Sequence, residues 1–422
     1  MHMKAFFRKP ARLIRSQFFP LADQIIVSGG NFLTIALSAN FLGLQEQGKL
    51  GLIITAYGAI MVANLALIFQ RAAIDAPQAG SPHTYRSLLA GFQLLVALPI
   101  AILVVLILYF LGTQSGWRFT REDFQLVGAF LLLQQLASFD RRSAYIINRS
   151  RYAVLSSALL YIPRLAAILL IRPVTVRHIL SISILSCLIP AARTIYFGLR
   201  SLLASLPDTL RFIRAHTASA RWLILAAPLD WLWANIPVYF LGSIEGLAAV
   251  GVLTAVSSIA NVGNILIELL ETEGAARLGR LKDGDGAAWR KGLLELLLVG
   301  LLGWAGFFAI FALFGGQLLV FILGDKYSDY GMVLLTLWIA KFFFFLFRIN
   351  AIRHRTKTHT AIALYGFLFG CIILLLILAP VIRRFGVLGA AAGLAGGALF
   401  IIIGQEFARL FFQKAASANS DH

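Results

Sequence analysis

Charged and amide side chains inside long apolar stretches are the residues of this chain that packing alone does not explain. Arg164 follows Pro163 near the middle of one such stretch. A charge that faces lipid at this depth costs about 3 kcal/mol, so we expect Arg164 to face protein or a water-filled cavity. Its planar guanidinium could bind phosphate oxygens at two points, or it could pair with a carboxylate such as Asp23 or Asp230.

Five further side chains could belong to the same kind of site. Lys341 could line a cavity, or its alkyl stem could carry the amine toward the cytoplasmic end of its helix. Asp23 and Asp230 could bind a coupling proton or cation, pair with Arg164, or lie beside interfacial cations. Asn31 and Asn235 favour helix–helix hydrogen bonds over contacts with sugars. The candidate substrate-binding residues are therefore Arg164, Lys341, Asp230, Asp23, Asn31 and Asn235.

The chain contains no motif of a known catalytic or metal site. It has no H-E-x-x-H, no Walker A sequence, no G-x-S-x-G and no Cys/His metal spacing. Its two cysteines, Cys187 and Cys371, both fall in apolar stretches, so no disulfide framework is expected. We expect no catalytic residue, metal or cofactor. Transport without an ATP site would use a proton or sodium gradient, or would follow the substrate downhill.

Composition places these residues in a membrane protein. The chain is 59% hydrophobic and 13% charged, with a mean hydropathy of +0.82. Soluble proteins carry about 25% charged residues. The net charge of +18 is concentrated in short loops, where membrane topology and anionic lipid explain it. We therefore expect membrane lipids, and no nucleic acid, among the partners.

The elements that must position the candidate residues are about twelve apolar spans. They are 18–42, 50–69, 87–111, 124–147, 153–171, 179–199, 222–242, 247–267, 292–314, 330–347, 360–380 and 387–411. Most of the 37 Lys and Arg residues fall in alternate loops and in the two tails, and 8 fall in the loops on the opposite side. By the positive-inside rule, both termini are then cytoplasmic. The sequence predicts an all-α, multi-pass membrane protein.

Short matches between the two halves of the chain indicate duplication. Phe-Leu-Gly ends both the first and the seventh span, at 41–43 and 240–242. Gly51, Val62 and Asn64 recur at the same spacing in a second set, Gly251, Val262 and Asn264. Each half contains six spans, an even number, so both halves start on the same side of the membrane and the repeat is parallel. A pseudo-two-fold axis along the membrane normal then relates two six-helix lobes. The predicted parts are a basic N-terminus 1–17, lobes 18–199 and 222–411, a cytoplasmic linker 200–221, and a tail 412–422.

Two segments resemble a known group of transporters. Residues 31–51, NFLTIALSANFLGLQEQGKLG, resemble the first-helix signature of polysaccharide transporters, and residues 314–335 resemble the external loop before their tenth helix. With its length and 6+6 layout, the chain is similar to Wzx-type O-antigen and exopolysaccharide flippases of the multidrug/oligosaccharidyl-lipid/polysaccharide exporter superfamily. This chain has Asn40 where that family often has Arg, so no cationic contact is expected there.

The resemblance implies movement of an undecaprenyl-pyrophosphate-linked oligosaccharide across the bacterial inner membrane for O-antigen, exopolysaccharide or capsule assembly. A polysaccharide polymerase and chain-length machinery would be partners. One alternative is a cation-coupled small-molecule antiporter of MATE type, although cationic drugs call for carboxylates and the deepest candidate here is basic. Another is a membrane-embedded enzyme of envelope synthesis, which the short external loops and absent catalytic motif disfavour.

Overall fold

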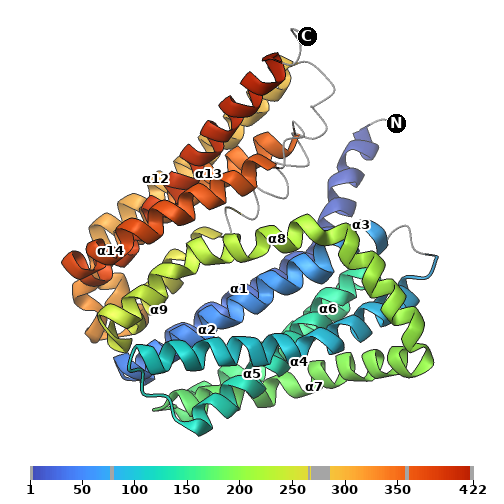
Figure 1. Cartoon of the computed structure of the whole chain (residues 1–422), viewed down its shortest axis with the longest axis horizontal. Helices are drawn as coiled ribbons and strands as arrows, with labels where there is room; N and C mark the ends of the chain where they lie inside the picture. The colour runs from blue at the N-terminus through green and yellow to red at the C-terminus, as the bar shows by residue number, and fades with distance from the viewer. Residues whose placement is uncertain (1–2, 77–79, 265–266, 268–285, 357–360, 419–422) are drawn as a thin grey trace. The chain divides into compact units, whose positions relative to one another are not determined.

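The chain forms long helices. The computed structural model describes residues 3–76, 80–264, 267, 286–356 and 361–418, and within these ranges every regular element is helical (Figure 1). The elements are α1 (Met3–Phe41), α2 (Leu44–Asn64), a π-helix (Leu65–Phe69), α3 (Gln70–Asp75), α4 (Pro82–Gln114), α5 (Arg121–Ile146), α6 (Ser150–Ile171), α7 (Val176–Ala204), α8 (Leu206–Ile244), α9 (Leu247–Ala260), α12 (Gly286–Leu323), a 3-10 helix (Asp325–Tyr330), α13 (Gly331–Thr356) and α14 (Ala361–Ala418).

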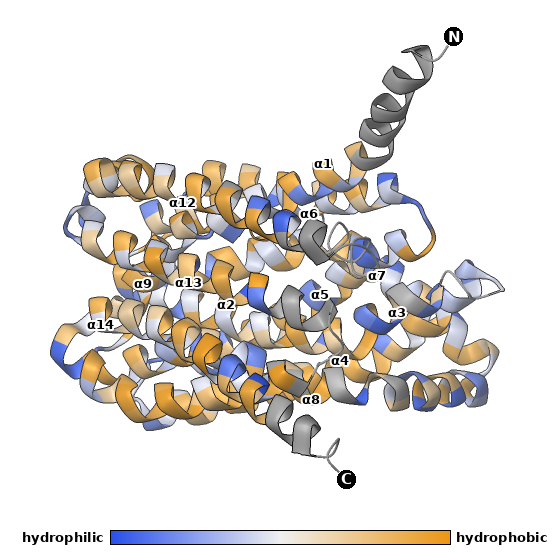
Figure 2. Cartoon of the chain, turned by 90° about the horizontal axis from the view of Figure 1, so that it is seen from above, coloured by the Kyte–Doolittle hydropathy of each residue, from blue (hydrophilic) through white to orange (hydrophobic). Residues whose placement is uncertain are grey.

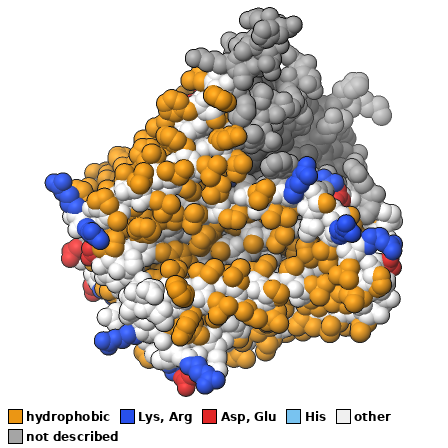
Figure 3. All heavy atoms as spheres, in the orientation of Figure 1, with side chains coloured by type: hydrophobic (Ala, Val, Ile, Leu, Met, Phe, Trp, Pro, Cys, Tyr) orange, Lys and Arg blue, Asp and Glu red, His pale blue; other side chains and the backbone are white. Residues whose placement is uncertain are grey.

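Each of the twelve predicted spans overlaps one of these helices, although the span 247–267 extends beyond the end of α9 and includes residues outside the described ranges. Eight helical segments of the described chain are long and apolar enough to cross a membrane, and α14 alone holds the last two predicted spans. The three spans outside those eight segments lie in α5, α8 and α9. Hydrophobic residues line most of α12 and α14 (Figure 2). On the face in Figure 3, hydrophobic side chains predominate and charged ones lie near the margins.

Contacts divide the chain into two compact units. Unit 1 comprises Met1–Gly43 and Ala56–Ala227, and unit 2 comprises Leu44–Thr55 and Pro228–His422. The first part of α2 therefore belongs to unit 2, and the first part of α8 to unit 1. Residues 200–221, predicted as a loop between the lobes, are helical on both sides of Ser205. The side chains of the predicted N-terminal segment 1–17 and tail 412–422 lie outside the described residues.

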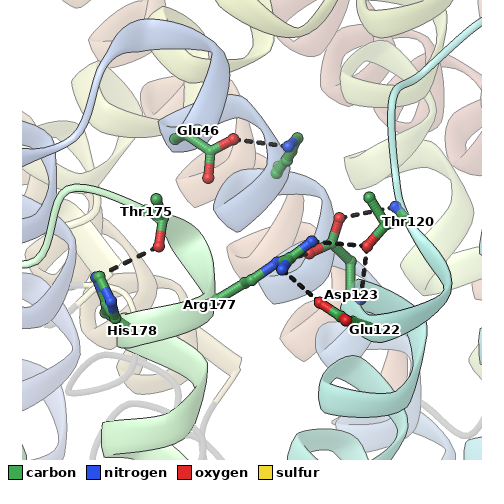
Figure 4. A network of polar contacts seen from close by, with 8 residues as sticks. Glu46, Thr120, Glu122, Asp123, Thr175, Arg177 and His178 are labelled. Carbon is green, nitrogen blue, oxygen red and sulfur yellow. Dashed lines mark hydrogen bonds and ion pairs between the residues drawn. The ribbon is translucent and has the colours of Figure 1, made fainter.

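Helix α5 is the centre of unit 1, where it packs against α4, α6 and α7. It begins with a capping box, in which Thr120 and Asp123 satisfy each other's backbone amides. Arg177 at the start of α7 donates to the Asp123 carboxylate at 2.7 Å and to Thr120 at 2.8 Å (Figure 4). This network fixes one end of α5 against α7. Asp140 lies seventeen residues further on, which a helix converts to about 26 Å.

In unit 2, α13 packs against α14, α12 and α9. The indole of Trp338 contacts that of Trp304 in a tilted arrangement, with ring centroids 4.0 Å apart, and donates to the Trp304 backbone oxygen at 3.1 Å. The long α14 is interrupted at Gly386, whose φ of 55° breaks the helical path. A backbone with positive φ favours glycine. Gly386 lies between the predicted spans 360–380 and 387–411, so the break in the helix separates these two spans.

A close crossing of α2 and α9 joins the two halves of the sequence repeat inside unit 2. A Cβ added at Gly48 would lie 1.8 Å from the backbone oxygen of Leu247. One added at Gly251 would lie 2.2 Å from the backbone oxygen of Leu44. Gly51, the repeat partner of Gly251, faces Thr254 at the same crossing. Two equivalent glycines thus permit the same close helix approach from both sides.

Candidate functional site: the polar interior of unit 1

Buried polar side chains of unit 1 gather around α5. The buried Asp and Arg side chains among the described residues all belong to this unit: Asp23, Arg86, Asp123, Asp140 and Arg164. Because α5 is covered by three helices, its polar side chains must find partners on those neighbours rather than in water. They do so in three clusters.

The first cluster surrounds Asp23 of α1, which is 2% exposed. Its carboxylate accepts hydrogen bonds from Arg141 at 2.8 Å, from Tyr145 at 2.7 Å and from Ser157 at 2.5 Å. Three donors from α5 and α6, one of them cationic, satisfy the carboxylate oxygens. Asp23 is therefore the partner of Arg141, and it makes no described contact with Arg164.

The second cluster surrounds Asp140 of α5. Arg86 of α4 lies 3.2 Å and Arg193 of α7 lies 3.3 Å from its oxygens, and Ser156 of α6 donates at 2.9 Å. Arg86 also donates to Ser143 at 3.0 Å. One carboxylate thus holds two arginines, and the cluster keeps a positive charge. Four helices meet at this single aspartate.

The third cluster surrounds Arg164, which is 4% exposed on α6. Its guanidinium donates to the side-chain oxygen of Gln134 at 2.7 Å and to the hydroxyl of Ser186 at 3.2 Å. It lies 3.6 Å from the sulfur of Cys187 and 5.3 Å from the ring centroid of Tyr161. No carboxylate among the described residues pairs with it. Arg164 is therefore a buried cation stabilised only by neutral groups.

Tyr161 connects Arg164 to a second predicted residue. Its hydroxyl donates to the side-chain oxygen of Asn31 at 2.8 Å, while its ring lies beside Arg164. Asn31 itself is exposed. Among the six candidate residues, the structure links Arg164 and Asn31 through one tyrosine and gives Asp23 a separate cluster.

The other three candidates belong to unit 2, and they do not share a cluster there. Lys341 is half-buried with its amine 5.8 Å from the Phe344 ring centroid, and no described carboxylate pairs with it. Asp230 accepts from the indole of Trp233 at 3.4 Å. Asn235 donates to the backbone oxygen of Trp231 at 2.7 Å, within its own helix. These contacts involve aromatic and backbone groups rather than ion pairs.

Asp140, Arg86 and Arg193 were not predicted from the sequence to form one group. The available signal was a carboxylate inside the predicted span 124–147, followed at once by two arginines. When Asp140, Arg141 and Arg142 are all interpreted as interfacial charges, their different partners cannot be predicted. Consecutive helical residues point about 100° apart, so Asp140 and Arg141 face different partners.

No protein-family model and no curated protein matches the chain. Solved structures do resemble it. An inward-facing multidrug resistance MATE family transporter of the MOP superfamily has a TM-score of 0.60 at 16% identity, covering 95% of this chain and 96% of that chain. The lipid II flippase MurJ, in an inward closed conformation, has a TM-score of 0.70 at 10% identity, covering 93% of this chain and 87% of that chain.

A MATE transporter from Vibrio cholerae has a TM-score of 0.56 at 14% identity and covers 97% of both chains. At these identities the likeness concerns the fold. The chain is a multi-pass membrane protein with the helical fold of MATE transporters and MurJ. The all-α, multi-pass fold class predicted from the sequence is confirmed.

Proposed function

We propose that this chain is a flippase that moves an undecaprenyl-pyrophosphate-linked oligosaccharide from the cytoplasmic to the periplasmic leaflet of the bacterial inner membrane. The lipid tail stays in the bilayer while the polar head crosses. The products would feed polysaccharide assembly, with a polymerase and chain-length machinery downstream. Both chain termini are cytoplasmic in this proposal.

The observation that carries the proposal is the charge balance inside unit 1. Arg86 and Arg193 pair with Asp140, and Arg141 pairs with Asp23. The third buried aspartate, Asp123, pairs with Arg177. Arg164 adds a further cation with only neutral partners. Charges in a low-dielectric interior are screened less than surface charges, so the surplus makes the potential of this unit positive. A positive interior favours a pyrophosphate head over a cationic drug.

Fold similarity supports a substrate of this kind. The solved structure with a TM-score of 0.70 is named as a lipid II flippase, whereas the MATE transporters reported above have scores of 0.56 and 0.60. A fold alone does not define a function. The proposal therefore rests on the charge balance of unit 1, and the fold similarity to a lipid II flippase is consistent with it.

Reconstitution tests the proposal. The full chain is placed in proteoliposomes that contain a fluorescent polyprenyl-diphosphate oligosaccharide, and a membrane-impermeant enzyme or quencher reports which leaflet holds the head. We expect head-group movement in both directions at a rate well above that of protein-free vesicles. Vesicles with Arg164→Ala protein at matched density are the internal control. Equal rates with and without the wild-type chain would contradict the proposal.

A MATE-type antiporter is the second candidate, and the buried carboxylate Asp23 on α1 is the observation that favours it. Proton or cation coupling needs a carboxylate that changes its occupancy during transport. Here Arg141, Tyr145 and Ser157 hold that carboxylate. The same vesicles, loaded with a cationic dye and given a proton or sodium gradient, distinguish the two. Gradient-dependent dye movement without head-group movement would identify the antiporter.

A further inference from the structure

Unit 1 contains a pocket that the clusters above do not fill. It has a volume of about 680 Å³, within the range of small-ligand sites. The start of α4, the turn between α5 and α6, the end of α7 and the start of α8 line it. Every lining residue belongs to unit 1.

Cations dominate the lining of this pocket. Arg86, Arg149, Arg193 and Arg200 line it, together with His83. Arg86 and Arg193 share the single carboxylate of Asp140, and Arg149 and Arg200 have no described acidic partner. The one acidic lining residue is Asp208, which is already bonded to Ser205 at 2.7 Å and lies 3.4 Å from Arg211. The pocket therefore has a surplus of positive charge.

Aromatic rings of the pocket lining contact three of the four arginines. The Arg86 guanidinium lies over the Phe197 ring at 4.6 Å from its centroid. Two arginines contact the ring of Tyr152, with Arg149 at 5.5 Å and Arg193 at 5.7 Å from its centroid. Cation–π contacts of this kind orient guanidinium groups without neutralising them. The charge stays available to an anion, and hydroxyls of the lining, among them Ser87 and Ser201, can donate to its oxygens.

Apolar surface continues from the pocket along α7 and α8. Tyr196, Leu199 and Leu203 are exposed at successive turns of α7, with Leu203 85% exposed, and Leu206 and Leu210 are exposed at the start of α8. In a membrane protein such a surface contacts acyl chains. A basic pocket beside an apolar surface is complementary to the two parts of a phospholipid, the phosphate diester and the acyl chains.

We propose that this pocket binds the head group of an acidic phospholipid, such as phosphatidylglycerol or cardiolipin, from the leaflet at that end of unit 1. Basic pockets between membrane helices on the cytoplasmic side bind such head groups. The site is separate from Arg164 and needs no transport. It therefore goes beyond the proposed function, and only the name of its leaflet depends on the proposed topology.

The test compares two double variants of the full chain with equal charge. Arg149→Gln with Arg200→Gln removes the two exposed pocket cations and leaves the ion pairs of Asp140 intact. Arg151→Gln with Arg214→Gln removes two exposed arginines that do not line the pocket. Native mass spectrometry of each purified protein measures ligand binding. The titrated ligands are phosphatidylglycerol, cardiolipin, phosphatidylethanolamine, inorganic pyrophosphate and a polyprenyl-diphosphate oligosaccharide.

We expect wild-type protein and the Arg151/Arg214 variant to bind the two acidic lipids more tightly than phosphatidylethanolamine. The pocket variant should bind them at least about tenfold more weakly, because each cation near a lipid surface contributes to the attraction. Equal acidic-lipid binding by both variants would overturn the proposal. So would a pocket-dependent preference for inorganic pyrophosphate or a polyprenyl-diphosphate oligosaccharide over phospholipid, since the site would then belong to the transported substrate. Failure of the vesicle assay for head-group movement leaves these outcomes unchanged.

Discussion

Replacing Gly251 by alanine should destabilise unit 2, although alanine is the better helix former. A helical Gly→Ala change by itself gains about 0.5–1 kcal/mol. At Gly251 the new Cβ would lie 2.2 Å from the Leu44 backbone oxygen and 3.0 Å from the Gly48 nitrogen. Both atoms are backbone, so no side-chain rotation relieves the overlap, and α2 and α9 must separate.

Helix separation has a cost that the structure allows us to bound. Overpacking of a well-packed interior typically costs about 1–3 kcal/mol. A gap of 0.5–1 Å also forfeits about a quarter to a half of each dispersion contact along the crossing. Gly29 of α1 is the matched control, since a Cβ there meets nothing within 4 Å. The helix-propensity gain is common to both changes, so Gly251→Ala should be less stable than Gly29→Ala by about 1–3 kcal/mol.

Thermal unfolding in detergent, followed by fluorescence-detected size exclusion, measures the difference. Gly29→Ala should unfold at or slightly above the wild-type temperature, and Gly251→Ala several degrees below it. The repeat-equivalent change, Gly51→Ala, should be milder and should be partly rescued by Thr254→Ala, because Thr254 presents a side chain at 2.5 Å. If Gly251→Ala matched Gly29→Ala in stability, the close crossing of α2 and α9 would be refuted.

Three further predictions follow from unit 1 and the spans. Arg164→Ala should reduce head-group movement at least about tenfold at normal membrane abundance. The variant should remain folded, because removal of a buried charge offsets the free energy of the lost hydrogen bonds. Unaltered movement would remove Arg164 from the mechanism. Burial lowers the pKa of His216 in the folded chain. As the pH falls below about 6.5, the unfolded chain therefore binds a proton before the folded chain does, and the folded state loses stability. Between pH 7.5 and 5.5 the melting temperature should fall more for wild type than for His216→Phe, and equal falls would contradict this. Reporter fusions after Arg149 should report cytoplasm, and those after Gly116 and Ser243 periplasm; two adjacent reversals would contradict the twelve-span map.

The sequence was sufficient for the fold class because lipid imposes a simple rule on it. Each span must be apolar and helical over its length, and both properties can be read locally. The break between the last two spans was predicted in the same way, since Gly386 lies between two apolar runs. The helical state of residues 200–221 was not predicted. The rule applies only to apolar spans, and the sequence of a polar, basic segment is compatible with either a loop or a helix.

The candidate site was predicted less completely because partners come from distant parts of the chain. The sequence predicted that Arg164 avoids lipid, and its exposed fraction of 4% agrees. Its acceptors, Gln134 and Ser186, lie on the neighbouring helices α5 and α7. Helical periodicity states which face a residue occupies, but not which neighbour covers that face. The choice between a carboxylate and neutral partners therefore needed the packed structure.

The two halves of the repeat share a scaffold but not a chemistry. Gly51 and Gly251 still serve the same crossing, whereas the matched asparagines have diverged: Asn64 donates to Gln135 of a neighbouring helix, and Asn264 donates to Asn261 nearby in its own segment. A close helix approach requires only a glycine at the crossing, so both halves of a repeat can retain it. A buried ion pair needs two compatible residues at once, so a change in either partner exposes the other to the cost of an unpaired charge. Among the described residues, the buried Asp and Arg side chains lie in unit 1, whereas the candidates Lys341 and Asp230 of unit 2 contact aromatic rings.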